Sequence, residues 1–474
     1  MSLALEVDST LPSTLVCGRA AIHPLRGRSR NGRIVQSATL QVGEQKFLVR
    51  RAKPRLDANL KAGEHPLCGW EAEAVIRSDM AAEQVRVSIR TGDGRDAGSL
   101  EPSQIDIVER PALEQVQLPD SCHIVICMAA FNPQIKAFER QIISIQEQTY
   151  PHWHCIIQDD GSAPELLDAM RAVCVADDRF SFFSGEPNRG FYHNFERCLY
   201  RVPATVPYVA LADQDDAWMP EKLQRLLDGL GQSTLVYSDM NIVDDRGQVL
   251  SETYWTKRRN NYRDMETVFL ANTVTGAAAL FRRELLDLAL PFPIRIGDAF
   301  HDHWLALCAF TAGGVAYVQQ PLYCYYQHAE NVIGHCEEAN PTRRKAAAPS
   351  TSKFPHRKMA PHGIMARIMR RLQGLEYGYQ HEHRRLQLMA RTLLLRQSQL
   401  PAHCRVVVDR LADDGWRCAL FLLRSHLRVR HRGDTTGNAE LRLFTWLVGH
   451  WLLVAFAWLV LTPYSHVHNY IRRI

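Results

Sequence analysis

The chain of 474 residues contains no C-x-x-C pair, although it has 12 cysteines. Protein zinc sites commonly use such pairs, so a structural zinc site is not expected. Several cysteines lie inside apolar stretches, where a free thiol packs as a small hydrophobic group. This usage favours a reducing compartment over a secreted scaffold held by disulfides.

The first 16 residues lack both a basic region and a long apolar run, so no signal peptide is predicted. One long apolar run occurs near the other end, where residues 443–462 carry no charge. The run is about as long as the ~20 residues that a bilayer-spanning helix needs. It contains Gly449 and His450, and Trp451 lies near its middle rather than at an interface. Membrane contact and a buried terminal helix both stay open.

Charge is unevenly distributed. The net charge of +5 is small, and 46% hydrophobic with 23% charged residues is ordinary globular composition. Residues 364–433, however, contain 14 arginines, no lysine and 5 acidic residues. Such a segment suits an anionic surface such as lipid headgroups, or it is a solvated helix face. The arginines are not interleaved with a recognisable nucleic-acid module, so no nucleic acid is expected as a partner.

The length predicts two to four domains of roughly 100–200 residues each. Residues 1–115 consist of short alternating stretches, which predict a small antiparallel β domain with a structural or carbohydrate-binding role. Residues 337–363 are rich in Pro, Ala, Ser and basic residues and are predicted to be a linker. Residues 364–474 are predicted to be helical and basic, with the apolar segment 443–462 near their end.

Between residues 120 and 336, apolar strand-like runs alternate with helical patterns. Alternation on this scale predicts an α/β domain with a doubly wound, mostly parallel sheet. The predicted strands are 123–131, 152–158, 179–185, 208–213 and 234–240, and the first helices are 133–148 and 163–174.

Acidic residues follow two of these strands. Ligands of an open α/β sheet bind beyond the carboxyl ends of its strands, where Asp159-Asp160 and Asp213-Gln214-Asp215-Asp216 are expected. Crowded carboxylates repel each other unless a cation or hydrogen-bond donors compensate them, and hard oxygen ligands suit Mg²⁺ or Mn²⁺. Asp159-Asp160 would accept hydrogen bonds from a base or a ribose, and Phe131 would lie against the base. The alternative for 213–216 is a turn that caps the next helix.

Eight motifs occur in one order between residues 120 and 336. They are CMAAFN (127–132), QTYP (148–151), QDDGS (158–162), PNRGFYHNF (187–195), ADQDDAW (212–218), NTVTGAAALFRRELL (272–286), HDHW (301–304) and YYQHAENVIG (325–334). On these motifs, the chain resembles the inverting glycosyltransferases of family 2, which have the GT-A fold. NRGFYHN and ADQDDAW are most similar to rhamnosyltransferase-like members that build bacterial surface polysaccharides.

The resemblance implies roles for individual residues. A divalent cation, Mn²⁺ or Mg²⁺, would be held on the donor's diphosphate by Asp215, Asp216 and His328. The nucleotide sugar would be bound by Ala130, Phe131, Asn132, Asp159, Asp160, Asn188, Arg189, Gly190 and Asp213.

On the acceptor side, the resemblance implies that Asp302 is the catalytic base and that His303 and Trp304 contact the acceptor. From the residues alone, Asp302 as a helix cap and Trp304 as a core aromatic stay open. The family often has Thr where Ala130 stands and Arg where Tyr326 stands. Because Tyr326 stands where the family often has Arg, another residue would have to contact the leaving group. Arg189 is a candidate for this contact.

The expected function is metal-dependent transfer of a hexosyl or deoxyhexosyl group from a nucleotide sugar to a carbohydrate or lipid-linked acceptor, with inversion. The expected location is the cytoplasm, at the inner face of the cytoplasmic membrane. A non-catalytic homologue that acts as a membrane-anchored binding or scaffold protein is the alternative. The presence of Asp213, Asp215 and Asp302 favours the enzyme.

Overall fold

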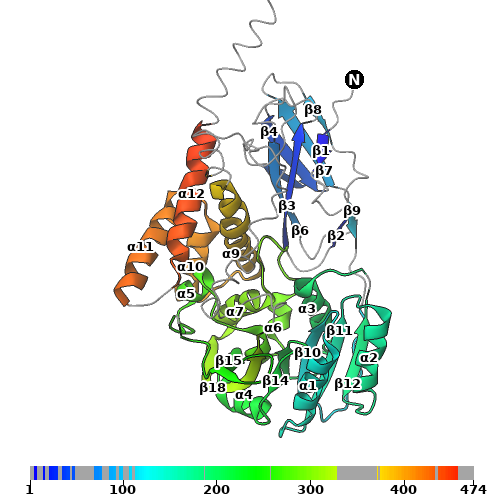
Figure 1. Cartoon of the computed structure of the whole chain (residues 1–474). Coiled ribbons are helices and arrows are strands. Elements are labelled where there is room, and N and C mark those ends of the chain that lie inside the picture. The colour runs from blue at the N-terminus through cyan, green and yellow to red at the C-terminus, as the bar shows by residue number, and fades with distance from the viewer. Residues whose placement is uncertain are drawn as a thin grey trace, which may run out of the picture.

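A computed structural model describes residues 113–327 (except 186 and 257), 371, 374–432 and 436–456, and nine strands between residues 5 and 108. Figure 1 shows these strands at one end of the molecule, an α/β unit at the other, and a group of C-terminal helices beside both. His328, the linker 337–363 and residues 457–462 lie outside the described residues.

The N-terminal strands form three small sheets. One has the order β1-β3-β6, another the order β5-β4-β7-β8, and β2 pairs with β9. Pairing is antiparallel in the first two sheets and parallel between β2 and β9. The bounds are β1 Leu5–Val7, β2 Thr14–Val16, β3 Ala21–Ser29, β4 Val35–Val42, β5 Gln45–Leu48, β6 Gly69–Ile76, β7 Val85–Thr91, β8 Asp96–Ser99 and β9 Asp106–Val108.

A nine-stranded sheet forms the centre of the α/β unit, with the order β12-β11-β10-β13-β17-β15-β18-β14 and β16 beside β15. The first four strands of this order are parallel, and β17 runs against both of its neighbours. The predicted α/β fold class is therefore confirmed. The bounds are β10 Ile124–Ala130, β11 Trp153–Asp159, β12 Phe180–Ser184, β13 Tyr208–Ala212, β14 Ala217–Trp218, β15 Leu235–Val243, β16 Val249–Ser251, β17 Ala279–Arg282 and β18 Val315–Tyr326.

Helices cover both faces of this sheet, so its middle strands are buried on both sides (Figure 1). α1 and α4 share one face, because the Gln148 side chain after α1 accepts a hydrogen bond from Leu223 N in α4. α3 and α7 share the other, where Phe195 stacks on His301. The bounds are α1 Ile135–Gln146, α2 Pro164–Cys174, α3 Phe191–Tyr200, α4 Lys222–Leu230, α5 Met265–Leu270, α6 Leu285–Ala289 and α7 His301–Ala312.

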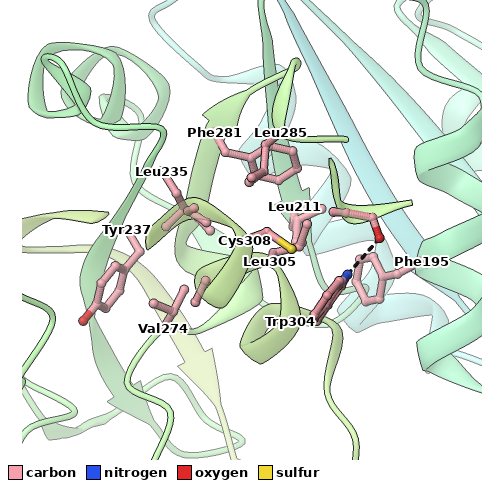
Figure 2. Close-up of a cluster of buried hydrophobic side chains, with 14 of the residues drawn as sticks. Phe195, Leu211, Leu235, Tyr237, Val274, Phe281, Leu285, Trp304, Leu305 and Cys308 are labelled. Carbon is pink, nitrogen blue, oxygen red and sulfur yellow. Dashed lines mark hydrogen bonds between the residues drawn. The ribbon is translucent and has the colours of Figure 1, made fainter. Parts of the chain in front are cut away.

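The core between the sheet and α7 is shown in Figure 2. Trp304, Leu305 and Cys308 of α7 pack against side chains from the sheet, among them Leu211 and Phe281. α7 is apolar on nearly all sides, as expected of a helix buried between layers. This burial fixes the position of its first turn, which carries Asp302.

The C-terminal helices dock on the α6–α7 side of the α/β unit. Arg396 donates hydrogen bonds to the carbonyls of Leu288, Ala289 and Pro291 at 2.6–2.9 Å. Within the described residues, no helix is both long and apolar enough to span a bilayer. These helices are α9 Arg384–Arg396, α10 Ala402–Ala412, α11 Trp416–Arg432 and α12 Ala439–Phe456.

Candidate active site

The loops that follow β10 and β13 are joined by one glutamine. Gln214 accepts a hydrogen bond from Phe131 N at 2.8 Å and donates one to Phe131 O at 3.2 Å. The two strands are neighbours in parallel register, so their carboxyl ends reach the same sheet edge. This pairing holds the predicted base-binding segment directly beside the acidic loop 213–216.

A second set of bonds joins the β10 loop to the β11 loop. Asp160 N donates to Ala130 O at 2.9 Å, and Asn132 N donates to Ser162 Oγ at 2.8 Å. Ala163 N in turn donates to Asn132 Oδ1 at 2.9 Å. The Phe131 ring stays 44% exposed, which leaves an aromatic face open at this edge.

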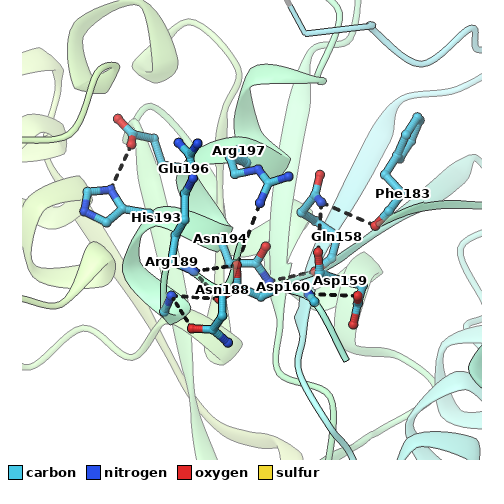
Figure 3. A network of polar contacts seen from close by, with 12 residues as sticks. Gln158, Asp159, Asp160, Phe183, Asn188, Arg189, His193, Asn194, Glu196 and Arg197 are labelled. Atoms are coloured by element: carbon cyan, nitrogen blue, oxygen red, sulfur yellow. Dashed lines mark hydrogen bonds and ion pairs between the residues drawn. The ribbon is translucent and has the colours of Figure 1, made fainter. Parts of the chain in front are cut away.

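Asp159 and Asp160 are both buried, and both carboxylates accept several hydrogen bonds (Figure 3). Asp159 accepts from the backbone N–H groups of Gly161 and Ser162 and from Ser162 Oγ. Asp160 accepts from Arg189 N at 3.0 Å and from Gly190 N at 2.7 Å. The two acids thus shape their loops and tie the start of α3 to β11.

Positive charge surrounds Asp160. Arg197 NH1 lies 3.7 Å from its carboxylate. In the adjoining loop, Asn188 Oδ1 accepts a hydrogen bond from Gly190 N at 3.1 Å. Burial and then the neighbouring Arg189 lower the pKa of Arg197. Two guanidinium groups therefore lie close together at the predicted nucleotide side, an arrangement suited to an anionic ligand.

The acids of 213–216 converge with Asp302, although Asp302 comes from α7. The pKa of Asp213 is raised to about 7, first by burial and then by the charges of Asp215 and Asp302. The carboxylates of Asp215 and Asp302, from two distant segments, are therefore near enough to Asp213 to raise its pKa. Such an arrangement is costly without a compensating cation.

Part of this compensation comes from Lys222, which is fully buried. Its ammonium group lies over the ring of Trp218 at 3.7 Å. Burial lowers the pKa of Lys222 well below the usual range, and the charges of Asp216 and Asp213 act in the opposite direction. Asp216 is only 1% exposed, and its pKa is raised by burial first and then by Asp215 and Asp213. Its Oδ2 atom has no hydrogen-bond partner among the residues that the structure describes.

A divalent cation fits the chemistry of this loop. Mg²⁺-type sites commonly use one or two carboxylates and complete their coordination with substrate phosphates and water. Accordingly, no preassembled group of three His, Cys, Asp or Glu ligands is required, and none occurs in the part of the chain that the structure describes. Of the two predicted aspartate ligands, Asp215 is the more open and Asp216 is buried.

Asp302 is held at the first turn of α7 by three donors. Asn272 Nδ2 donates to Oδ1 at 3.1 Å, Gly276 N donates to Oδ2 at 3.2 Å, and His303 N donates to Oδ1 at 2.6 Å. Burial nevertheless raises the pKa of Asp302 to about 6. The three donors thus fix the carboxylate in place, and its pKa is suited to accepting a proton near neutral pH.

The two predicted acceptor contacts are buried. Trp304 is 0% exposed and donates from Nε1 to Ala289 O at 2.8 Å, so it occupies the core position that the sequence left open. The His303 ring is also buried, and burial lowers its pKa to about 3. Both side chains therefore pack in the core and help to hold α7 in place.

The sequence did not point to four residues that organise the site, namely Gln214, Lys222, Asn272 and Arg140. Arg140 NH2 donates to Asp215 O at 2.5 Å, and its guanidinium lies 3.4 Å from the Tyr326 ring centroid. Tyr326, which stands where the family often has Arg, therefore lies beside an arginine from α1.

Known glycosyltransferases share sequence with the part of the chain that forms this site. The family model for glycosyl transferase family 2 matches residues 125–288, which include β10, β13 and the acid loop. TuaG of Bacillus subtilis, a glycosyltransferase named for teichuronic acid biosynthesis, is 30% identical over 183 residues, or 37% of this chain and 69% of TuaG. The chain belongs to glycosyltransferase family 2.

Two solved structures are similar to this chain at lower identity. S. aureus TarS in complex with UDP-GlcNAc shares 14% identity at a TM-score of 0.39, over 69% of this chain and 92% of that one. A Pyrobaculum calidifontis mannosyltransferase in complex with GDP-Man and Mn²⁺ shares 15% identity at a TM-score of 0.36, over 70% of this chain and 86% of that one.

Proposed function

We propose that this family 2 glycosyltransferase moves a hexosyl or deoxyhexosyl group from a nucleotide sugar to a carbohydrate or lipid-linked acceptor, with inversion at the anomeric carbon. The observation that carries the proposal is the hydrogen-bonded connection between Asp302 and the start of α4, which follows the acid loop: Gly276 N donates to Asp302 Oδ2, and the neighbouring Ala277 O accepts from Lys222 Nζ. The raised pKa of Asp213, caused by burial and then by Asp215 and Asp302, agrees with this connection. Asp302 is the proposed base on the diphosphate side of the site.

Donor binding uses the edge formed by the β10, β11 and α3 loops. The exposed Phe131 ring offers a stacking face for the base, while Asp159, Asp160 and Asn132 fix the loops around it. The backbone of Asn188, Arg189 and Gly190 closes this side, and the guanidinium groups of Arg189 and Arg197 supply positive charge. These features orient an anionic nucleotide without fixing which base it carries.

In the transfer step, Asp302 accepts the proton of the acceptor hydroxyl, and that oxygen attacks the anomeric carbon opposite the leaving diphosphate. A single displacement inverts the anomeric configuration, so no second carboxylate is needed as a nucleophile. Asn272, Gly276 and His303 hold the Asp302 carboxylate in place.

A bound Mn²⁺ or Mg²⁺ would neutralise charge on the departing diphosphate. Asp215 is the proposed first protein ligand, with Asp216 and His328 as further candidates and Asp213 on the ribose side. Lys222 lies buried beneath the same loop, where burial lowers its pKa and the charges of Asp216 and Asp213 act against that lowering.

Synthesis of a bacterial surface polysaccharide is the proposed setting, with rhamnosyltransferase-like members as the nearest subfamily. Support comes from the NRGFYHN and ADQDDAW motifs and from the name of TuaG. Because such acceptors are often lipid-linked, we place the protein at the inner face of the cytoplasmic membrane, with its C-terminal helices as the contact.

A nucleotide-sugar screen tests the proposal. A donor that binds the folded state raises the apparent melting temperature, and we expect Mn²⁺ to increase this shift. Asp215→Ala should abolish the Mn²⁺-dependent part, while the exposed Asp228→Ala in α4 should not change it. A full panel of nucleotide sugars without any shift, and without sugar transfer to acceptor, would instead support a non-catalytic scaffold.

A further inference from the structure

α11 exposes an apolar stripe that no described element covers. Trp416, Leu420, Leu423 and Leu427 are all exposed, with Trp416 at 67% and Leu427 at 61%. Their spacing of four, three and four residues places them along one side of the helix. The opposite side packs inward through Cys418, Leu422 and Val429. Isolated exposed leucines are common, but a continuous stripe along a helix calls for a partner.

Arginines border this stripe on one flank. Arg417 and Arg424 are exposed and lie seven residues apart, about a quarter-turn around the helix from the leucines. α11 contains five arginines and no acidic residue. A helix with a leucine and tryptophan stripe beside an arginine row has the character of interfacial helices, whose apolar face enters a bilayer while basic side chains reach the headgroups.

α11 is fixed relative to the active site. Arg428 NH2 lies 2.6 Å from both carboxylate oxygens of Glu266, which stands in the first turn of α5. α5 leads within two residues to Asn272, the donor to Asp302. Figure 1 shows α11 along the outer edge of the molecule, with α5 near its inner side. The apolar stripe and the acceptor side of the site are thus parts of one connected structure.

We propose that the exposed face of α11, formed by Trp416, Leu420, Leu423 and Leu427 with Arg417 and Arg424, binds the surface of an anionic phospholipid bilayer. This inference rests on the membrane contact proposed above and deepens it, because it assigns the contact to a helix lying on the bilayer rather than to a spanning segment. Charge complementarity favours anionic headgroups over a protein partner, since Arg417 and Arg424 flank the stripe and α11 itself contains no acidic residue.

Vesicle flotation with the full-length protein tests the surface. The wild type should float with phosphatidylcholine vesicles that contain one-third phosphatidylglycerol and not with phosphatidylcholine alone. Arg417→Gln/Arg424→Gln should weaken binding roughly thirtyfold, at about fivefold for each basic residue near an anionic surface. Leu423→Ser/Leu427→Ser should weaken it by about tenfold or more through lost apolar burial.

Matched controls change exposed residues elsewhere. Val249→Ser/Leu250→Ser on β16 and Arg246→Gln/Arg259→Gln in the α/β unit should bind as the wild type does. Each α11 variant should keep its melting temperature and its transfer rate to a water-soluble acceptor.

Three outcomes would overturn the inference: α11 variants that float like the wild type, equal flotation with neutral vesicles, or a wild-type dimer that Leu423→Ser/Leu427→Ser converts to monomers while no form binds vesicles. Vesicle binding by a protein that transfers no sugar would refute the proposed function but would still support membrane binding by α11.

Discussion

Lys222 Nζ donates a hydrogen bond to the carbonyl oxygen of Ala277 at 2.5 Å. Lys222 begins α4, which follows the acid loop and the short strand β14, whereas Ala277 follows Gly276, which bonds to Asp302. One buried ammonium group therefore connects the donor side of the site with the segment that orients the proposed base. The same group balances part of the negative charge of Asp213 and Asp216.

Lys222→Met should destabilise the protein by about 3–5 kcal/mol, because removing one member of a buried charged group leaves the others uncompensated. Ala277 O would also lose its donor. Urea unfolding measures the loss. Lys136→Met in α1 removes an exposed lysine and serves as control, with an expected change within about 0.5 kcal/mol. Equal stability of the two variants would refute this role.

Asp302→Asn should lower kcat by about 10²–10⁴-fold, the usual contribution of a general base. Donor affinity should stay nearly unchanged, because the nucleotide side of the site is formed by other loops. Single-turnover transfer and donor titration separate the two quantities. Asp298→Asn, an exposed acid just before α7, is the control. A variant that loses donor binding as strongly as turnover would place Asp302 in the donor site instead.

The pH dependence of kcat/KM should show an acid limb near pH 6, because burial raises the pKa of Asp302 to about 6. Below that value the carboxyl is protonated and cannot accept the hydroxyl proton. Stability should change in the opposite direction: the folded protein holds this proton more tightly than the unfolded chain, so the stabilisation is present below about pH 4 and is lost as pH rises through 6.

Comparing wild type with Asp302→Asn isolates this effect. The difference in unfolding free energy between the two should shift in favour of the variant between pH 4 and 7. A constant difference across this range would mean that the pKa of Asp302 is not raised.

Trp304→Phe should cost about 2–3 kcal/mol of stability, since it removes core volume and the Nε1 bond to Ala289 O. The KM for acceptor should be unchanged because the indole is enclosed. Steady-state kinetics with varied acceptor, beside thermal unfolding, distinguish packing from sugar stacking. A raised acceptor KM with unchanged stability would instead indicate that Trp304 contacts the acceptor.

Most of the α/β unit was predictable, because its strands are continuous apolar runs, two of which, β11 and β13, lead into acids. The antiparallel strand β17 was not, since its four residues ALFR carry no pattern that distinguishes them from the preceding apolar segment. Its place between β13 and β15 depends on tertiary packing. The sequence also gave no sign of the N-terminal parallel pair β2 and β9.

The site divides in the same way. The edge rule located Asp159, Asp160 and Asp213 because it depends only on strand direction. It could not reveal which side of α7 faces the cleft, so Trp304 was open to two interpretations until its burial decided between them. Lys222 was missed for a different reason: lysine is almost never fully buried, and only the surrounding acids and the Trp218 ring make it possible here.

The missing side chain at Gly276 sets a distance within the site. A methyl group there would lie 2.6 Å from His301 Nε2, inside the range where atoms must move apart. His301 is stacked on Phe195 with ring centroids 3.9 Å apart and has little freedom to yield. The backbone at residue 276 therefore packs closely against the start of α7. Only glycine at this position allows the close approach that brings Gly276 N within hydrogen-bond distance of Asp302.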